Sequence, residues 1–127
     1  MSEVLIIEDN PDNLALIEFI LHSEGYTARV ATTGPEGVEQ ALSSEFAFIV
    51  LDIQLPGLEG TEVLNMIRKH ERACPGKTPV PIIAMTSYAM SGDREKLLGA
   101  GCTGYIEKPI EPMEVMQQIR DILQDQI

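Results

Sequence analysis

The sequence reads FAFIVL over residues 46–51 and then turns abruptly acidic at Asp52. A run this short and this apolar is typical of a strand that is buried on both faces of a parallel sheet. Comparable runs occur at 4–7 (VLII), 82–85 (IIAM) and 104–106 (GYI), and a weaker one occurs at 26–31. The sequence therefore predicts five strands, of which the one at 46–51 is the most apolar.

Longer amphipathic segments lie between these runs. Residues 11–24 are predicted to form a helix, because apolar side chains recur there at about 100° per residue and Gly25 follows as a stop. The other predicted helices begin near Thr33 or cover residues 61–72, 91–98 and 113–124. Strands that alternate with such helices require right-handed crossovers. We therefore predict an α/β domain, a (βα)5 parallel sheet with helices on both faces.

The composition limits the classes of function. The 127 residues fit one domain with its own core. The net charge of −11 opposes a sequence-independent grip on nucleic acid or on anionic lipid. No apolar run approaches the ~18–20 residues of a membrane helix, and Cys74 and Cys102 form no CxxC pair. We expect a cytoplasmic domain that binds no nucleic acid and does not insert into membranes.

Polar side chains follow four of the five predicted strands. Glu8 and Asp9 follow the first strand, Asp52 the third and Thr86 the fourth, and Lys108 comes just after the fifth. In open parallel sheets, ligands bind beyond the carboxyl ends of the strands. We therefore expect these five groups to face one site.

The chemistry of these groups indicates a metal ion and a phosphoryl group. Three carboxylates within a few ångströms repel one another and need a compensating cation. Oxygen ligands without thiolate or imidazole suit Mg²⁺, and Mn²⁺ is expected to substitute for it. Lys108 can meet an anion, and the hydroxyl of Thr86 can donate a hydrogen bond to it. This set suits phosphoryl transfer to Asp52.

The chain resembles the receiver domains of two-component response regulators over residues 3–124. The segments that carry the resemblance are VLIIEDN (4–10), IVLDIQLPGLEG (49–60), IIAMTSYA (82–89) and GYIEKPI (104–110). AMSGD (89–93) and GCTGYIEKPI (101–110) are especially similar to single-domain regulators of the DivK type and to receivers attached to hybrid kinases. The resemblance implies a flavodoxin-like, doubly wound domain over residues 1–127, with strand order 2-1-3-4-5.

The resemblance also implies roles for the acidic residues. Asp52 would accept a phosphoryl group from a phosphohistidine, and Glu8 and Asp9 would bind Mg²⁺ together with it. The backbone carbonyl of Gln54 would be a further metal ligand, and its side chain would flank the phosphoryl group. Glu8 has a longer side chain than the aspartate often found there, so we expect it to act mainly through a metal-bound water.

The remaining site residues are implied in the same way. Lys108 would pair with one phosphoryl oxygen, and Thr86 would donate its hydroxyl to another. The small Ser87 would leave access to the acceptor, whereas the bulky Gln54 and Tyr88 would flank the phosphoryl group and slow its hydrolysis. A cis peptide bond is expected before Pro109.

A conformational switch is implied as well. Phosphorylation of Asp52 would draw Thr86 inward, and the aromatic residue three positions before the lysine, Tyr105, would turn into the vacated space. The face formed by the fourth helix, fifth strand and fifth helix, roughly residues 90–125, would change. A downstream protein target would bind this face.

Partner docking is expected near the first helix. Leu16 and Phe19 fall outside the arc predicted to face the core, and an exposed phenylalanine suits contact with an apolar helix. The resemblance implies a histidine kinase or a histidine phosphotransfer protein as the partner. It would meet these two residues together with Pro109 and Ile110.

Three other functions share some of these features. An aspartyl-phosphate phosphatase of the haloacid-dehalogenase kind expects D-x-D at the nucleophile, where this chain has DIQ at 52–54. A nucleotide- or flavin-binding module needs a Gly- or Ser/Thr-rich loop where residues 8–12 are acidic. A receiver that works without phosphorylation would not need all five strand-end groups. We therefore expect a signalling domain rather than an enzyme.

The place of the domain in its pathway is also an expectation. Met1 lies just before the first predicted strand and the chain ends with the fifth helix, so no output domain is expected. We predict a single-domain response regulator of a two-component phosphorelay. The alternative is a receiver domain excised from a hybrid histidine kinase.

Overall fold

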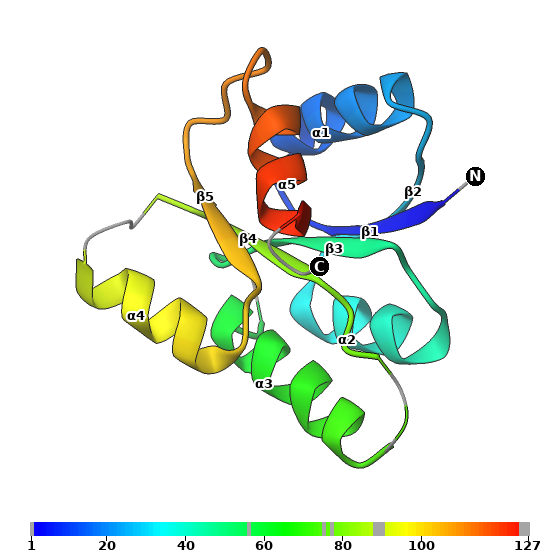
Figure 1. Cartoon of the computed structure of the whole chain (residues 1–127), viewed down its shortest axis with the longest axis vertical. Coiled ribbons are helices and arrows are strands. Elements are labelled where there is room, and N and C mark those ends of the chain that lie inside the picture. The colour runs from blue at the N-terminus through cyan, green and yellow to red at the C-terminus, as the bar shows by residue number, and fades with distance from the viewer. Residues whose placement is uncertain (1, 56, 75, 77, 88–90, 125–127) are drawn as a thin grey trace.

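The structure is a computed structural model that describes residues 2–55, 57–74, 76, 78–87 and 91–124, with the backbone alone at 91–93. Five strands and five helices alternate along these residues (Figure 1). The strands are β1 (Glu3–Ile7), β2 (Thr27–Ala31), β3 (Phe48–Asp52), β4 (Ile82–Thr86) and β5 (Gly104–Glu107). The helices are α1 (Pro11–Ser23), α2 (Gly34–Ser43), α3 (Gly60–Arg72), α4 (Ser91–Ala100) and α5 (Val115–Gln124). None of the described helices is long and apolar enough to span a bilayer.

The five strands pair in parallel in the order β2-β1-β3-β4-β5, which confirms the predicted fold class. Helices α1 and α5 cover one face of the sheet, and α2, α3 and α4 cover the other (Figure 1). The chain leaves β1 toward β2 on one side and returns to β3 on the other. The carboxyl ends of β1 and β3 therefore form the switch point of the sheet, where such folds bind ligands.

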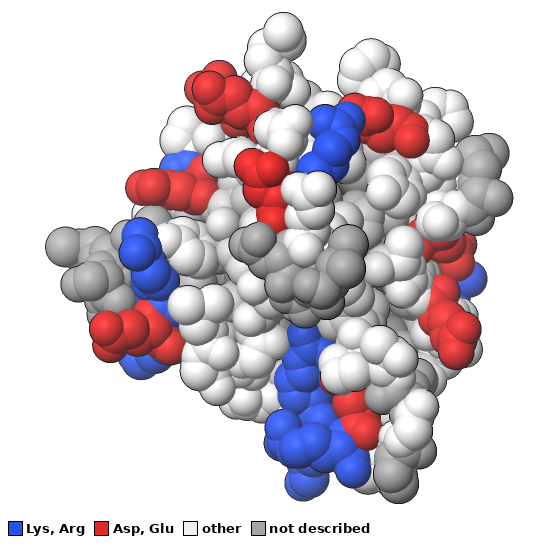
Figure 2. Space-filling model, viewed as in Figure 1, with Lys and Arg blue, Asp and Glu red and all other residues white. Residues whose placement is uncertain are grey.

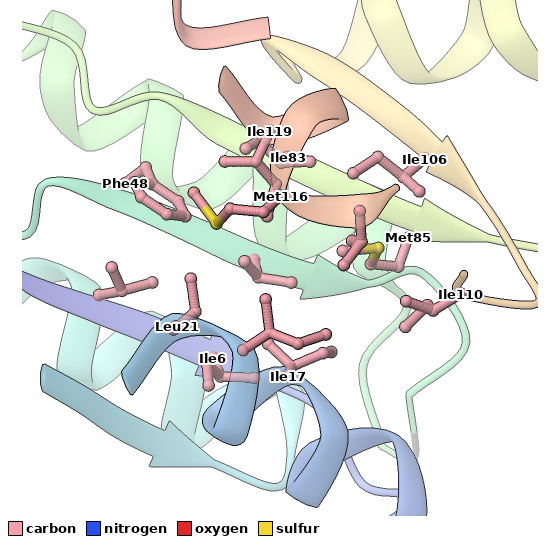
Figure 3. Close-up of a cluster of buried hydrophobic side chains, with 14 residues drawn as sticks. Ile6, Ile17, Leu21, Phe48, Ile83, Met85, Ile106, Ile110, Met116 and Ile119 are labelled. Atoms are coloured by element: carbon pink, nitrogen blue, oxygen red, sulfur yellow. The ribbon is translucent and has the colours of Figure 1, made fainter. Parts of the chain in front are cut away.

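Each face of the sheet carries one hydrophobic cluster. Figure 3 shows the cluster beneath α1 and α5, where Phe48 and Met85 from the sheet meet Leu21 and Ile119 from the helices. Alternate residues of the central strands face the second cluster: Leu5, Ile7, Ile49, Leu51, Ile82 and Ala84. All five residues of β3 are buried. Full burial of a large apolar side chain stabilises the fold by about 1.5–3 kcal/mol. The buried strands therefore hold the residues at their carboxyl ends in fixed positions.

Several element boundaries differ from the sequence prediction by one or two residues, among them the starts of β3 and α5. β3 begins at Phe48 because Phe46 leaves the sheet, where its half-buried ring lies 5.2 Å from the guanidinium carbon of Arg29. α5 begins at Val115, after a turn over residues 112–114. Differences of one or two residues are usual at element ends, and none of them moves a site residue.

Charge is unevenly distributed over the surface. Figure 2 shows acidic side chains around the visible face and a basic cluster at its lower end, where α3 ends. The last turn of α3 carries Lys69, His70 and Arg72. Cations at this position complement the negative end of the helix dipole, so the cluster has a structural explanation.

A close backbone approach fixes the loop between β3 and α3. The amide of Gly60 donates to the carbonyl of Ile53 at 3.0 Å. A Cβ atom at Gly60 would lie 2.5 Å from the Cα of Ile53, which is backbone and cannot swing aside. We expect Gly60→Ala to lower the free energy of unfolding by about 1–3 kcal/mol, as overpacking does elsewhere. Urea denaturation followed by circular dichroism measures this change.

The matched control is Gly99→Ala in α4. A Cβ atom there would meet nothing within 4 Å, and this residue lies in a helix. Alanine at such a position is expected to leave the stability unchanged or raise it by up to about 1 kcal/mol. Equal stabilities for the two alanine variants would show that the contact with Ile53 relaxes at no cost.

Candidate functional site

Three carboxylates gather at the switch point of the sheet. Glu8 and Asp9 follow β1, and Asp52 is the last residue of β3. The two strands are neighbours in which Ile7 pairs with Leu51, so the residues that follow are brought side by side. One carboxylate oxygen from each residue lies within 4.8 Å of the others. Glu8 and Asp52 are buried, whereas Asp9 is exposed.

Lys108 brings a positive charge to the same point. Its Nζ atom lies 3.0 Å from Oδ1 of Asp52 and 3.8 Å from Oε1 of Glu8. Its amide donates to the carbonyl of Thr86 at 2.7 Å, which fixes the backbone just beyond β5. The peptide bond between Lys108 and Pro109 is cis, as expected. The lysine therefore bridges the two buried carboxylates.

The carboxylate of Glu8 is only partly satisfied. Its Oε2 atom accepts hydrogen bonds from the amides of Asp9 at 3.1 Å and Asn10 at 3.3 Å. Its Oε1 atom is buried with no hydrogen-bond donor among the described residues. Burial away from water and, next, the neighbouring Asp52 raise the pKa of Glu8 to about 7, against smaller opposing effects of the Asn10 amide and Lys108.

This arrangement fits a divalent cation. Glu8 is a buried carboxylate with one oxygen that accepts no hydrogen bond from the described residues, and it lies next to the buried Asp52 and the exposed Asp9. The single positive charge of Lys108 does not balance three carboxylates, so a divalent cation would stabilise the cluster. The donors are all oxygen atoms, which suits a hard ion. The cluster of Glu8, Asp9 and Asp52 could therefore hold such a metal.

The other predicted site residues lie around Asp52. Thr86 ends β4 and is buried, one residue beyond the partner of Asp52 in the β3–β4 register. Ser87 follows it and is exposed. The amide of Gln54 donates to Oδ1 of Asp52 at 3.0 Å, and its side chain is exposed. Tyr88, predicted to flank the phosphoryl group, lies outside the described residues.

Tyr105 lies on β5, three residues before Lys108, and is half-buried against the cluster beneath α2, α3 and α4. The guanidinium carbon of Arg94 in α4 lies 5.4 Å from the centre of its ring. The position of Tyr105 was predicted, but Arg94 was not. No pattern in the sequence marks Arg94, because the contact depends on how α4 packs beside β5.

The predicted docking residues divide into two groups. Phe19 is 73% exposed, and Pro109 is also exposed. Leu16 is half-buried and packs against the core, contrary to the expected arc, at a point where it lines one hollow with Pro109 and Ile110. Ile110 is buried in the same cluster.

A surface hollow of about 440 Å³ lies between α1 and the segment after β5. It is lined by Asn13, Leu16, Ser87, Lys108, Pro109 and Ile110. Three of the four predicted docking residues therefore reach one depression, next to the lysine that contacts Asp52.

A second structural residue escaped the sequence analysis. The guanidinium of Arg68 in α3 donates from Nε to the carbonyl of Gly101 and from Nη1 to that of Val80, each at 2.8 Å. It also forms an ion pair with Glu71 at 2.7 Å. Arginine on a helix that carries other basic residues gives no sequence signal for such a role.

The comparisons with known proteins agree with this geometry. The sequence profile of the response regulator receiver domain family matches residues 4–120. The polar-differentiation response regulator DivK of Brucella ovis is 34% identical over 124 residues, which cover 98% of each chain. The signal transduction histidine-protein kinase BarA of Escherichia coli K12 is 38% identical over 108 residues, 85% of this chain. The chain spans only 11% of the length of that kinase.

Solved structures give the same result. The receiver domain of sensor histidine kinase PA1611 from Pseudomonas aeruginosa, with a magnesium ion coordinated in its active-site cleft, superposes with a TM-score of 0.82 at 35% identity, over 97% of this chain and 98% of that one. The receiver domain of Ssk1, crystallised with the phosphotransfer protein Ypd1 of Saccharomyces cerevisiae, has a TM-score of 0.85 at 31% identity, with 93% and 86% covered. The chain therefore belongs to the family of response regulator receiver domains.

Proposed function

We propose that the chain is a cytoplasmic, single-domain response regulator that accepts a phosphoryl group on Asp52. The observation that carries this proposal is the contact of the buried Asp52 with Lys108 inside a cluster of three carboxylates. The similarity to DivK over 98% of both chains supports the single-domain reading. A phosphoryl-accepting carboxylate must be held still, partly dehydrated and close to positive charge, and Asp52 meets these conditions.

The chemical step needs little from the protein beyond position and charge. An oxygen of the Asp52 carboxylate attacks the phosphorus of a phosphohistidine, and the new P–O bond forms as the P–N bond breaks. The electron pair of that bond returns to the imidazole nitrogen. Lys108 then moves from the carboxylate to a phosphoryl oxygen, and Thr86 donates its hydroxyl to another.

Glu8, Asp9 and Asp52 would hold Mg²⁺, together with the backbone carbonyl of Gln54. When bound, this ion supplies positive charge to the carboxylates and to the phosphoryl oxygens. The oxygen-only ligand set supports this choice, as does the magnesium ion in the cleft of the PA1611 receiver. Glu8 is buried and has the longer side chain, so it would contribute mainly through its charge and through a metal-bound water.

The partner of the transfer reaction is a histidine kinase or a histidine phosphotransfer protein. The complex of Ypd1 with the Ssk1 receiver supports this class of partner. We place it over the hollow between α1 and the segment after β5, and over the exposed Phe19, which lies three residues beyond Leu16 on α1. An apolar helix that carries the histidine would cover Phe19 and bring the histidine toward Asp52.

The output is a change on the opposite side of the site. When Thr86 turns toward the phosphoryl group, Tyr105 moves into the space beside it, and the α4-β5-α5 face is altered for a downstream protein target. The half-buried state of Tyr105 supports a ring that can take either position. The phosphoryl group can favour one position of the Tyr105 ring only through contacts that it makes in that conformation and not in the other.

One observation favours a second candidate. The chain is 38% identical to a segment that makes up 11% of the kinase BarA. This similarity supports a second role, as the receiver domain of a hybrid kinase. In either role the domain is not expected to turn over substrates. Steady hydrolysis of a chromogenic phosphate ester would contradict that expectation and favour a phosphatase.

The proposal is tested by incubation of the protein with acetyl phosphate and Mg²⁺, followed by intact-mass spectrometry. We expect a mass gain of one phosphoryl group, because a small phosphodonor needs only the acceptor, the cation and Lys108. The gain should vanish when EDTA removes the metal. A protein that stays unmodified with Mg²⁺ present would contradict the proposal.

A further inference from the structure

Helix α4 is firmly attached at its carboxyl end. The Arg68 guanidinium ties α3 to the carbonyl of Gly101, which directly follows α4, and to the carbonyl of Val80 before β4. Its ion pair with Glu71 is largely buried, with 14% and 9% of the two side chains exposed. An arginine held by several hydrogen bonds in such a place resists movement. This end of α4 therefore acts as a fixed point.

The contact nearer the other end of α4 is of a weaker kind. The Arg94 guanidinium lies over the ring of Tyr105, 5.4 Å from its centre, and Arg94 is exposed to solvent. A cation over an aromatic face at an exposed position contributes little free energy. Such a contact can be broken and remade without unfolding the helix.

A hollow of about 810 Å³ lies between α4 and the loop after β3. Gln54 and Thr86 line it on the side of the site, and Lys96, Leu97 and Ala100 line it on the side of α4. Close-packed interiors resist displacement, so the open space along Lys96, Leu97 and Ala100 leaves room for α4 to swing about its attachment at Gly101.

We propose that Arg94 is a positioning residue that couples α4 to the phosphoryl site, because its stacking on Tyr105 holds both groups in the unphosphorylated arrangement. This inference rests on the proposed function, in which Tyr105 moves when Thr86 turns to the phosphoryl group. Arg94 and Tyr105 cannot keep this contact once the ring has moved. The contact therefore opposes the phosphorylated state by its own free energy.

The test compares how tightly the wild type and Arg94→Ala bind a phosphoryl mimic, beryllium fluoride, in the presence of Mg²⁺. The affinity is measured from the nuclear magnetic resonance signals of the Tyr105 ring during the titration. Loss of an exposed cation–π contact should tighten binding about two- to fivefold. Arg94→Lys keeps the charge without the planar group, so it should lie between the two. The side chain of Arg94 is exposed, so both variants are expected to fold.

The control is Arg72→Ala in the last turn of α3, where an exposed cation is removed far from Tyr105. Either alanine variant changes the net charge from −11 to −12, and a more negative protein should bind an anion more weakly. The loss of the positive charge should therefore weaken the binding of beryllium fluoride, whereas the loss of the contact with Tyr105 should tighten it. We also expect faster hydrogen exchange of the α4 amides in unliganded Arg94→Ala than in Arg72→Ala.

Two outcomes would overturn the inference in different ways. If the wild type responds to beryllium fluoride but Arg94→Ala binds no more tightly than Arg72→Ala, the coupling role of Arg94 is wrong and the proposed function stands. If the wild type itself fails to respond, the proposed function is contradicted and the inference falls with it.

Discussion

Replacement of Asp52 by asparagine should abolish phosphorylation of the chain by acetyl phosphate. The amide is nearly the same size and leaves the packing at the end of β3 intact, but it is neutral and a poor nucleophile. Its neighbours Glu8 and Asp9 remain. They are not expected to take the phosphoryl group, because Lys108 makes its short contact with Asp52 and lies farther from Glu8. Intact-mass spectrometry should show no mass gain.

Two controls make this result specific. Asp12→Asn removes an exposed carboxylate from the first turn of α1, outside the cluster, and should be labelled like the wild type. Hydroxylamine should remove the label from the wild type, because it cleaves acyl phosphates but not the phosphate ester that Thr86 would form. Labelling that persists in Asp52→Asn, or resists hydroxylamine, would place the phosphoryl group elsewhere.

The alternation of strands and helices, and the residues at the strand ends, could be predicted because both follow from local patterns, whereas the order of the strands in the sheet came from the resemblance to receiver domains. An apolar run that stops at one charged residue, as at Asp52, fixes both the strand and the position of the charge. Parallel pairing then brings Glu8 and Asp52 to the same edge. No long-range detail is needed beyond the rule that ligands bind at carboxyl ends.

The errors of prediction arise where one element packs on another. Leu16 lies outside the arc that helix periodicity alone predicts to face the core, yet it packs against the cluster beneath α1 and α5. Arg68 and Arg94 are ordinary basic residues until α3, α4 and β5 are placed together. Periodicity describes one helix against one surface, so contacts made by a third element escape it.

The stability of the metal-free protein should fall as the pH rises from 5 to 8. The pKa of Glu8 is about 7 in the folded protein, raised from its ordinary value of 4.5 mainly by burial. Between these two values the folded state binds more protons than the unfolded state, so deprotonation favours unfolding. The loss should begin near pH 4.5, be complete just above pH 7, and amount to about 3 kcal/mol. Urea denaturation in EDTA across this range measures it.

The variant Glu8→Gln isolates this effect from the titration of other groups. Its amide cannot ionise, so the variant should match the wild type near pH 5 and exceed it by up to about 3 kcal/mol at pH 8 without metal. Glu39→Gln, an exposed position in α2, should follow the wild type at every pH.

Mg²⁺ should narrow the stability difference between the two proteins at pH 8. An ion that binds only the folded, ionised site stabilises it by mass action, and it should therefore stabilise the wild type more at pH 8 than at pH 5. Glu8→Gln removes a buried negative charge from the cluster, so Mg²⁺ should stabilise it less. If the stability gap between wild type and Glu8→Gln is the same at pH 5 and pH 8, and the same with and without Mg²⁺, then Glu8 does not carry the charge that the metal site requires.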